Sequence, residues 1–219
     1  MKTKKTYFPI LFVATVLYLI TGCGKSSNIT GPLADLSSQN LQNGAVKLQG
    51  TWASGCIKPD RAQGIKSGEA SLTFKGNDVS GDITAYIDSS CSVPLLKEHQ
   101  HGKYILGNST DSAGLASSID YNISDKTITL FDQRLVDAAA KNQSEICKLS
   151  KYQFSAGLAQ DVSDQEGCLH QDWIGRYPYS IIKVEGNHLR LGITDLGNGR
   201  YPENRSNKIS DDFLIKQNL

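Results

Sequence analysis

Two histidines separated by one residue, His99 and His101, have the spacing best suited to chemistry in this chain. On a β-strand, residues two apart point to the same face, so both imidazoles could reach one zinc or copper ion. Glu98 would then point to the opposite face, and no third ligand follows at an obvious spacing. We therefore predict that His99 and His101 lie in a solvated loop and hold no metal, and we expect no cofactor.

Other patterns that carry chemistry are missing from the sequence. There is no G-x-S-x-G elbow for a serine nucleophile, and neither a P-loop nor a G-x-G-x-x-G turn for a nucleotide. The glycine- and oxygen-rich segments at 107–111 and 195–199 depart from the EF-hand loop and favour plain surface turns. The sequence therefore predicts a protein that is not an enzyme.

The N-terminus has the pattern of an export signal that ends in a modifiable cysteine. Three lysines precede an apolar run over 7–20, which is shorter than the roughly 20 residues of a membrane span. The segment Ile20-Thr21-Gly22-Cys23 resembles a bacterial lipobox, which implies removal of residues 1–22 and acylation of Cys23. Because Gly24 is not aspartate, the resemblance also implies anchoring in the outer membrane of a bacterial envelope.

Four cysteines remain besides the lipobox cysteine: Cys56, Cys91, Cys147 and Cys168. An even number in an oxidising compartment indicates two disulfides, and four cysteines allow three pairings. Sequential pairing closes the shortest loops, so we favour Cys56–Cys91 and Cys147–Cys168. A metal site is disfavoured because the chain has no C-x-x-C motif.

The charge balance argues against a nucleic-acid partner. The chain has 23 Lys+Arg and 22 Asp+Glu, and the signal holds three of the lysines and no acid. The remainder therefore has a formal charge of −2, with no basic surface to attract a phosphate backbone.

A polar segment and a single domain follow the signal. Residues 23–44 are rich in serine, asparagine, glutamine and glycine, which predicts a flexible tether to one domain over 45–219. Turn signals lie at Gly76-Asn77-Asp78, Ser124-Asp125-Lys126 and Glu185-Gly186-Asn187. Expected strands cover 46–52, 70–74, 79–87, 103–106, 117–123, 127–131, 179–184 and 188–193, and a short helix is expected over 133–142. We predict an all-β domain, a single antiparallel barrel with a sandwich as the alternative.

Gly50-Thr51-Trp52, at the start of the domain, resembles the G-x-W signature of the lipocalin family. The resemblance implies that Gly50 allows a close turn and that Trp52 plugs the closed end of a barrel. It also implies a late arginine over the indole, for which Arg205 is our candidate, with Arg200 behind it. The T-D-x-x-Y turn motif of that family is missing from the chain.

A larger set of residues is similar to a group of uncharacterised bacterial envelope lipoproteins. The set comprises Gly50 to Cys56, Cys91 to Leu95, Cys168, Trp173 and the segment Tyr201 to Arg205. The similarity implies a lipocalin-like barrel with two disulfides. This group has no assigned reaction, so the similarity bears on fold and location alone.

A barrel of eight strands can hold one small ligand, so the expected function is binding of a small apolar ligand or lipid. Trp173, Tyr177 and Tyr179 are the aromatic candidates to line the cavity. The alternative is a structural or protein-interaction module that acts through long loops expected at 88–102 and 155–167. The expected partners are the membrane, through the lipid on the N-terminus, and the small ligand; the sequence identifies no protein partner.

Overall fold

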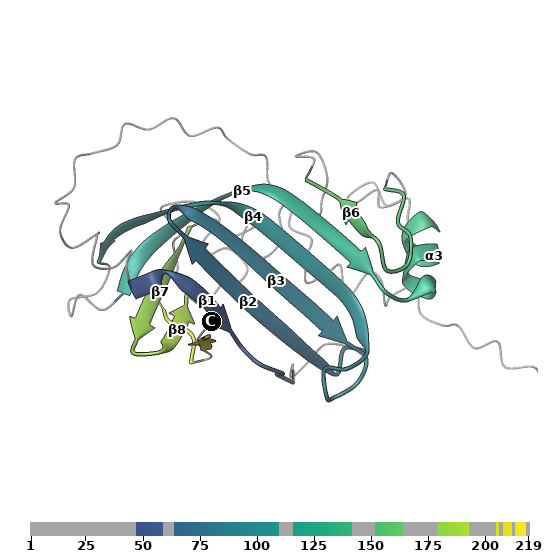
Figure 1. Cartoon of the computed structure of the whole chain (residues 1–219), viewed down its shortest axis with the longest axis horizontal. Helices are drawn as coiled ribbons and strands as arrows, with labels where there is room; N and C mark the ends of the chain where they lie inside the picture. Colours follow the sequence, from purple (N-terminus) through teal and green to yellow (C-terminus); the bar gives the residue numbers. More distant parts are fainter. Residues whose placement is uncertain are drawn as a thin grey trace, which may run out of the picture.

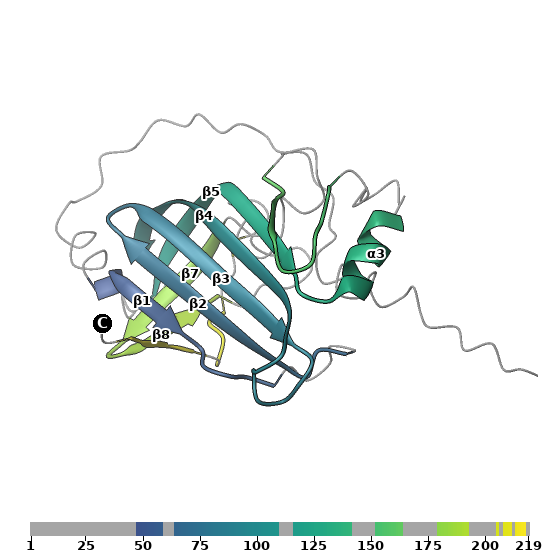
Figure 2. The same ribbon diagram turned by 45° about the vertical axis from the view of Figure 1, so that its right-hand side comes forward.

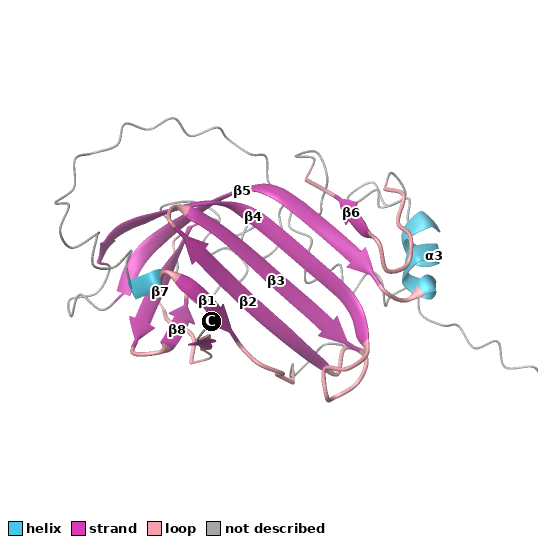
Figure 3. Cartoon of the chain, in the orientation of Figure 1, coloured by secondary structure: helices cyan, strands magenta, loops and turns pink. Residues whose placement is uncertain are grey.

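The computed structural model of the chain is built mainly of strands (Figure 3). It describes residues 47–58, 64–109, 116–141, 152–163, 179–192, 205, 208–211 and 213–217. The elements in these residues are β1 (Gly50–Ala53), β2 (Ser67–Lys75), β3 (Asp78–Tyr86), β4 (Pro94–Ser109), β5 (Ala116–Leu130), α3 (Gln133–Lys141), β6 (Ala159–Asp161), β7 (Tyr179–Glu185), β8 (His188–Leu191) and β9 (Leu214–Lys216). The prediction of a β-rich domain with one short helix is confirmed.

Eight of the strands form a closed antiparallel barrel (Figures 1 and 2). Their hydrogen-bonded order is β4-β3-β2-β1-β9-β8-β7-β5, and β5 pairs in turn with β4. Because this ring of pairings has no gap, the barrel is confirmed and the sandwich alternative is wrong. β6 stands outside the ring and pairs with the last part of β5.

The two ends of the barrel have different connections. One end, which we call the turn end, has the two-residue turns Gly76-Asn77 and Gly186-Asn187, both at expected turn positions. Gly76 and Gly186 have φ values of +60° and +61°, a left-handed conformation that glycine adopts without steric cost. The other end, which we call the disulfide end, has the Cys56–Cys91 disulfide and the helix α3 (Figure 1).

The barrel interior is filled by alternate residues of the strands, as expected for side chains that share one face. This barrel core consists of Leu48, Trp52, Leu72, Phe74, Val79, Tyr104, Ile119, Tyr121, Ile123, Ile182, Leu189 and Leu214. A second cluster joins the end of β5 to α3, through Ile128, Leu130, Val136, Ala139, Tyr152 and Val162. The helix begins after Asp132, whose Oδ1 accepts a hydrogen bond from Arg134 N at 2.8 Å, the usual role of an N-cap aspartate.

β5 is one continuous strand, where two strands with a turn at 124–126 were expected. Its pairing with β4 shifts by one residue between His101 and Gly102, which leaves Ser124 as the extra residue of a β-bulge. A Cβ on Gly102 would lie 2.2 Å from the backbone oxygen of Asn122, so the close approach of β4 and β5 at the bulge requires glycine. The polar residues that indicated a turn therefore belong to a bulge inside the strand.

Residues 94–102 are also strand, so the long loop expected over 88–102 is wrong for most of its length. The remaining connection between β3 and β4 is short and is held by the disulfide. Cys56 and Cys91 are 35 residues apart in sequence, a loop for which a chain-entropy model gives about 4 kcal/mol of stabilisation. This pairing of cysteines is as predicted, while Cys147 and Cys168 lie outside the described residues, so one disulfide of the expected two is seen.

Candidate functional site

Three polar side chains lie buried inside the barrel. Glu98 and Gln100 alternate with Gly102 and Tyr104 on the face of β4 that points inward. Lys126 on β5 is the register partner of Gln100. The side chain of Lys126 is 0% exposed and that of Glu98 is 9% exposed. We call Glu98, Gln100 and Lys126 the polar trio.

One carboxylate links the members of the polar trio. Lys126 Nζ lies 3.3 Å from Glu98 Oε2, and Gln100 Nε2 donates a hydrogen bond to Glu98 Oε1. Removing two charges from water costs several kcal/mol per ion, and their attraction offsets this only with good geometry and further hydrogen bonds. An apolar pair of similar volume would often be as stable or more so, which points to a role for the trio other than stability.

Apolar residues that face inward beside the polar trio are less completely buried than the barrel core. Ile83 on β3 is the register partner of Glu98, and Ala70 on β2 is the partner of Ile83. Both remain partly exposed, as does Leu96, the next inward residue along β4. Trp52, by contrast, is 0% exposed. These inward positions beside the trio are therefore only partly covered: Ala70 packs against the barrel core and Leu96 against the second cluster.

Ala70, Ile83 and Leu96 form an apolar wall, and the polar trio lies beside it with hydrogen-bonding groups. Lys126 and Gln100 carry N–H donors, and Glu98 carries acceptor oxygens. Burial raises the pKa of Tyr121 and of Tyr104 in the barrel core, so both phenols stay neutral and add no charge to the interior. The arrangement places hydrogen-bonding groups beside inward-facing apolar side chains.

Trp52 lies buried in the barrel core, and the cation over its indole is Lys216. Gly50 has φ +111°, and a Cβ there would lie 3.3 Å from Lys216 Cε. Trp52 Nε1 donates to the carbonyl of Leu48 at 2.8 Å, and Lys216 Nζ lies 5.2 Å from the ring centroid. The prediction that Arg205 covers the indole is wrong, because β9 brings Lys216 into register with Trp52.

Arg205 bridges β5 and β7 instead. Its Nη1 donates to the carbonyls of Ile119 and Ser180, both at 2.9 Å, and its Nη2 lies 2.6 Å from Asp120 Oδ1. Its Cζ lies 5.5 Å from the ring centroid of Tyr179. Ile119 and Ser180 form a register pair that faces inward, and the next pair consists of Asp120 and Tyr179. Because successive residues of a strand face opposite sides, Tyr179 faces outward. The prediction that Tyr179 lines a cavity is therefore wrong.

His99 and His101 lie on β4, so the expected loop is wrong, while the shared face that their spacing predicts is confirmed. His99 Nδ1 is 3.1 Å from Asp82 Oδ1, and His101 Nδ1 is 3.3 Å from Asp125 Oδ2. The imidazoles are 42% and 47% exposed, each beside its own carboxylate. Within the residues that the structure describes, no group of three or more His, Cys, Asp or Glu side chains could hold a metal ion.

The polar trio was not among the expected site residues, although part of it left a signal. Every other residue over 97–103 is lysine or histidine, a period of two that indicates a strand with Glu98 and Gln100 on its other face. Lys126 left no such signal, because the bulge at Ser124 reverses the alternation along β5.

Several other predicted site residues cannot be placed. They are Cys23, Cys147, Cys168, Trp173, Tyr177 and Arg200, which all lie outside the described residues. In the described part of the chain, no helix has the length and apolar character needed to cross a membrane.

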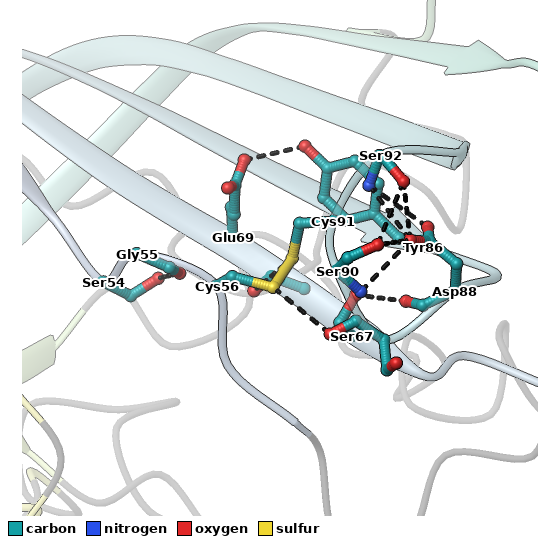
Figure 4. Close-up of a disulfide and its surroundings, with 12 residues drawn as sticks. Ser54, Gly55, Cys56, Ser67, Glu69, Tyr86, Asp88, Ser90, Cys91 and Ser92 are labelled. Atoms are coloured by element: carbon teal, nitrogen blue, oxygen red, sulfur yellow. Dashed lines mark hydrogen bonds between the residues drawn. A yellow bond between two sulfur atoms is a disulfide. The ribbon is translucent and has the colours of Figure 1, made fainter.

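A single carboxylate organises the connection at the disulfide end (Figure 4). Asp88 Oδ1 accepts a hydrogen bond from Val93 N at 2.8 Å, and Oδ2 accepts from Ser92 Oγ at 2.7 Å and Ser90 N at 3.1 Å. Bonds from the Ser90 hydroxyl, the Val93 amide and the Ser92 hydroxyl hold the pKa of Asp88 far below its usual range. The same loop holds Cys91 at φ 55°, a conformation uncommon for residues other than glycine.

Acid should loosen this loop before it unfolds the barrel. The pKa of Asp88 is lower in the folded chain than the ordinary value of 3.8. The ionised carboxylate therefore stabilises the loop fully above about pH 3.8, and this stabilisation is lost progressively as the pH falls further. Amide-exchange protection at Ser90, Ser92 and Val93 should therefore drop progressively between about pH 5 and pH 2. In the Asp88→Asn variant, protection should be low at both pH values; an equal pH dependence in that variant would contradict the assignment.

Comparison of the chain with models of protein families found no match, and comparison with curated protein sequences found none either.

Proposed function

We propose that this protein is a lipid-anchored protein of the bacterial envelope that binds a small apolar ligand or lipid inside its barrel and catalyses no reaction. The anchor rests on the basic and apolar N-terminus and on the lipobox-like segment that ends at Cys23. Gly24 after the cysteine supports the outer membrane as the location. The likeness to lipocalins rests on Gly50 and Trp52, and it agrees with a closed barrel of eight strands.

Metabolic labelling tests the anchor. Cells that express the full chain and receive an alkyne-tagged fatty acid should label the parent protein and not the Cys23→Ser variant. The labelled protein should fractionate with outer membranes. Equal labelling of both chains would exclude Cys23 as the acylated residue.

One observation carries the ligand proposal: inward apolar side chains stay partly exposed beside the buried polar trio. Ala70, Ile83 and Leu96 form the apolar wall, and the Glu98 carboxylate with Lys126 provides the polar point. A ligand with an apolar body and one polar group would cover that wall and form hydrogen bonds with the trio. Water beside the apolar wall would be released on binding, which supplies the driving force.

Filling the interior tests this proposal. Ile83→Trp adds a large side chain on the inward face, whereas Ser80→Trp adds the same side chain on the outward face of the same strand. A pyrene-labelled fatty acid should bind the parent chain and Ser80→Trp alike, and Ile83→Trp at least about tenfold more weakly, a difference of about 1.4 kcal/mol. Native mass spectrometry of the parent should also show a small molecule that is lost on denaturation. Equal probe binding by all three chains would refute a site inside the barrel.

A further inference from the structure

Five large apolar side chains are exposed together at the disulfide end of the barrel. They are Ile57, Ile87, Val93, Phe131 and Leu158, with exposed fractions of 51%, 37%, 47%, 38% and 65%. We call this set the apolar rim. Elsewhere in the described residues, the exposed large apolar side chains are Ile105, Phe213 and Ile215. Single exposed apolar residues are normal on a protein surface, but a group at one end indicates an interaction site.

Backbone hydrogen bonds place the members of the apolar rim on neighbouring segments around this end. Ile57 pairs with Gly68 at the start of β2. The bonds that link the following segments run from Lys66 N to Tyr86 O, from Ile87 N to Val93 O, from Phe131 N to Leu95 O and from Gly157 N to Leu130 O, with lengths of 2.9, 3.1, 3.0 and 2.8 Å. The members of the rim therefore lie on connections that neighbour one another at this end of the barrel.

We propose that the apolar rim docks on a lipid bilayer, the membrane that holds the acyl anchor of the chain itself. This inference rests on the lipid anchor of the proposed function. Acylation at Cys23 would keep the bilayer next to the domain at all times, so even a weak apolar contact would be occupied. No separate encounter with a soluble partner is needed for such a contact.

The length of chain between the anchor and the barrel permits this orientation. The described part of the chain begins at the turn end, where Gln49 Nε2 donates to Gly76 O at 3.2 Å. The connections that carry the apolar rim lie at the opposite end of the barrel. Residues 23–46 would span up to about 80 Å if fully extended. A strand such as β3, with 9 residues, spans about 30 Å. The anchored domain can therefore turn its far end towards the membrane.

The charges beside the rim match a bilayer surface. Lys58 and Lys66 are exposed close to Ile57, where they could reach anionic head groups while Ile57 enters the acyl region. Two carboxylates at the same end already have partners: Asp88 is surrounded by hydroxyl and amide donors of its own loop, and Asp132, next to Phe131, pairs with Arg134. An apolar band with flanking cations is the usual composition of a surface that lies in the membrane interface.

This orientation would also connect the bilayer with the proposed ligand site. Leu96 and Ile83 lie near the ends of β4 and β3 at which the apolar rim begins. A lipid could then move between the bilayer and the barrel interior with little exposure to water.

Vesicle flotation tests the docking surface without the anchor. The chain from Gly24 to Leu219 keeps every described strand and carries no acyl group. One variant replaces three rim residues, Ile57→Ser, Val93→Ser and Leu158→Ser, and a matched control replaces the three exposed apolar residues elsewhere, Ile105→Ser, Phe213→Ser and Ile215→Ser. The vesicles contain phosphatidylethanolamine and phosphatidylglycerol, and circular dichroism checks that each chain is folded.

The parent and the control should float with the vesicles, and the rim variant should partition at least about tenfold more weakly, since less apolar area is buried. A parent chain that does not float, or a rim variant and a control that lose binding equally, would overturn the docking surface. If an added soluble protein bound the rim and abolished flotation of the parent chain, that result would also overturn the docking surface. Because no acyl group is present, a negative result leaves the Cys23 labelling result intact, and probe binding in solution reports on the interior site separately.

Discussion

Replacing Glu98 with alanine should lower the free energy of unfolding by about 3–5 kcal/mol, the cost of removing one partner of a buried ion pair. The substitution deletes the carboxylate that lies 3.3 Å from Lys126 Nζ, while the ammonium group stays at a position with 0% exposure. Gln100 loses the acceptor of its Nε2 hydrogen bond at the same time. Urea unfolding followed by tryptophan fluorescence would measure the change.

Two further variants separate burial of charge from loss of packing. The double variant Glu98→Leu with Lys126→Met replaces the pair by apolar side chains and should unfold within about 1–2 kcal/mol of the parent, or be more stable. Asp82→Ala removes a carboxylate from the outer face of the same barrel, where it pairs with Lys97 at 2.9 Å. That surface pair should be worth about 1 kcal/mol or less. If Glu98→Ala cost no more than Asp82→Ala, the trio would not be an energetically important ion pair.

The same double variant connects stability with function. A barrel that folds well without charges inside has no structural need for them, so the trio would be retained for what it recognises. We expect the double variant to stay folded and to bind the pyrene-labelled fatty acid more weakly than the parent. The carboxyl group of the fatty acid would lose its hydrogen-bonding partners in the trio. Unchanged probe binding would mean that the ligand site lies away from the trio.

The sequence predicted those parts of the fold that depend on local signals. Gly76 and Gly186 stand in two-residue turns, where glycine adopts a left-handed conformation cheaply, and both hairpins were found. The helix α3 was found from its alanines, and Asp132 in front of it acts as a cap. Such features are decided within a few residues of sequence, so no knowledge of the tertiary structure is needed.

The missed features depend on contacts between distant segments. The polar run at 124–126 reads as a turn locally, but pairing with β4 makes it a bulge. β9 has 3 residues, too few to show an alternating pattern, yet it closes the barrel against β1. No sequence pattern therefore points to Lys216 as the cation over Trp52, whereas the family resemblance points to Arg205. The polar trio was missed because its charged residues face the interior, where sequence patterns predict apolar ones.

Replacing Trp52 with alanine should destabilise the barrel by about 3–5 kcal/mol, the range for deleting a large buried aromatic side chain. The indole is 0% exposed and belongs to the barrel core. Its removal would leave a cavity and would free the Leu48 carbonyl from the Nε1 donor at 2.8 Å. Thermal or urea unfolding followed by circular dichroism would measure the loss, since this variant loses Trp52, one of the two tryptophans of the chain. Phe213→Ala, at an aromatic residue that is 41% exposed, should cost about 1 kcal/mol or less.

A double-mutant cycle would show whether Trp52 and Lys216 act together in closing the barrel. Lys216→Met keeps the length of the side chain and removes the charge 5.2 Å from the ring centroid, which should cost about 0.5–2 kcal/mol. In the Trp52→Leu background, the same substitution should cost clearly less, because the ring that attracts the cation is absent. Equal costs in both backgrounds would mean that Lys216 contributes through strand pairing alone. A coupling of about 0.5 kcal/mol or more would show that the last described strand and the first are joined by a side-chain contact in addition to their hydrogen bonds.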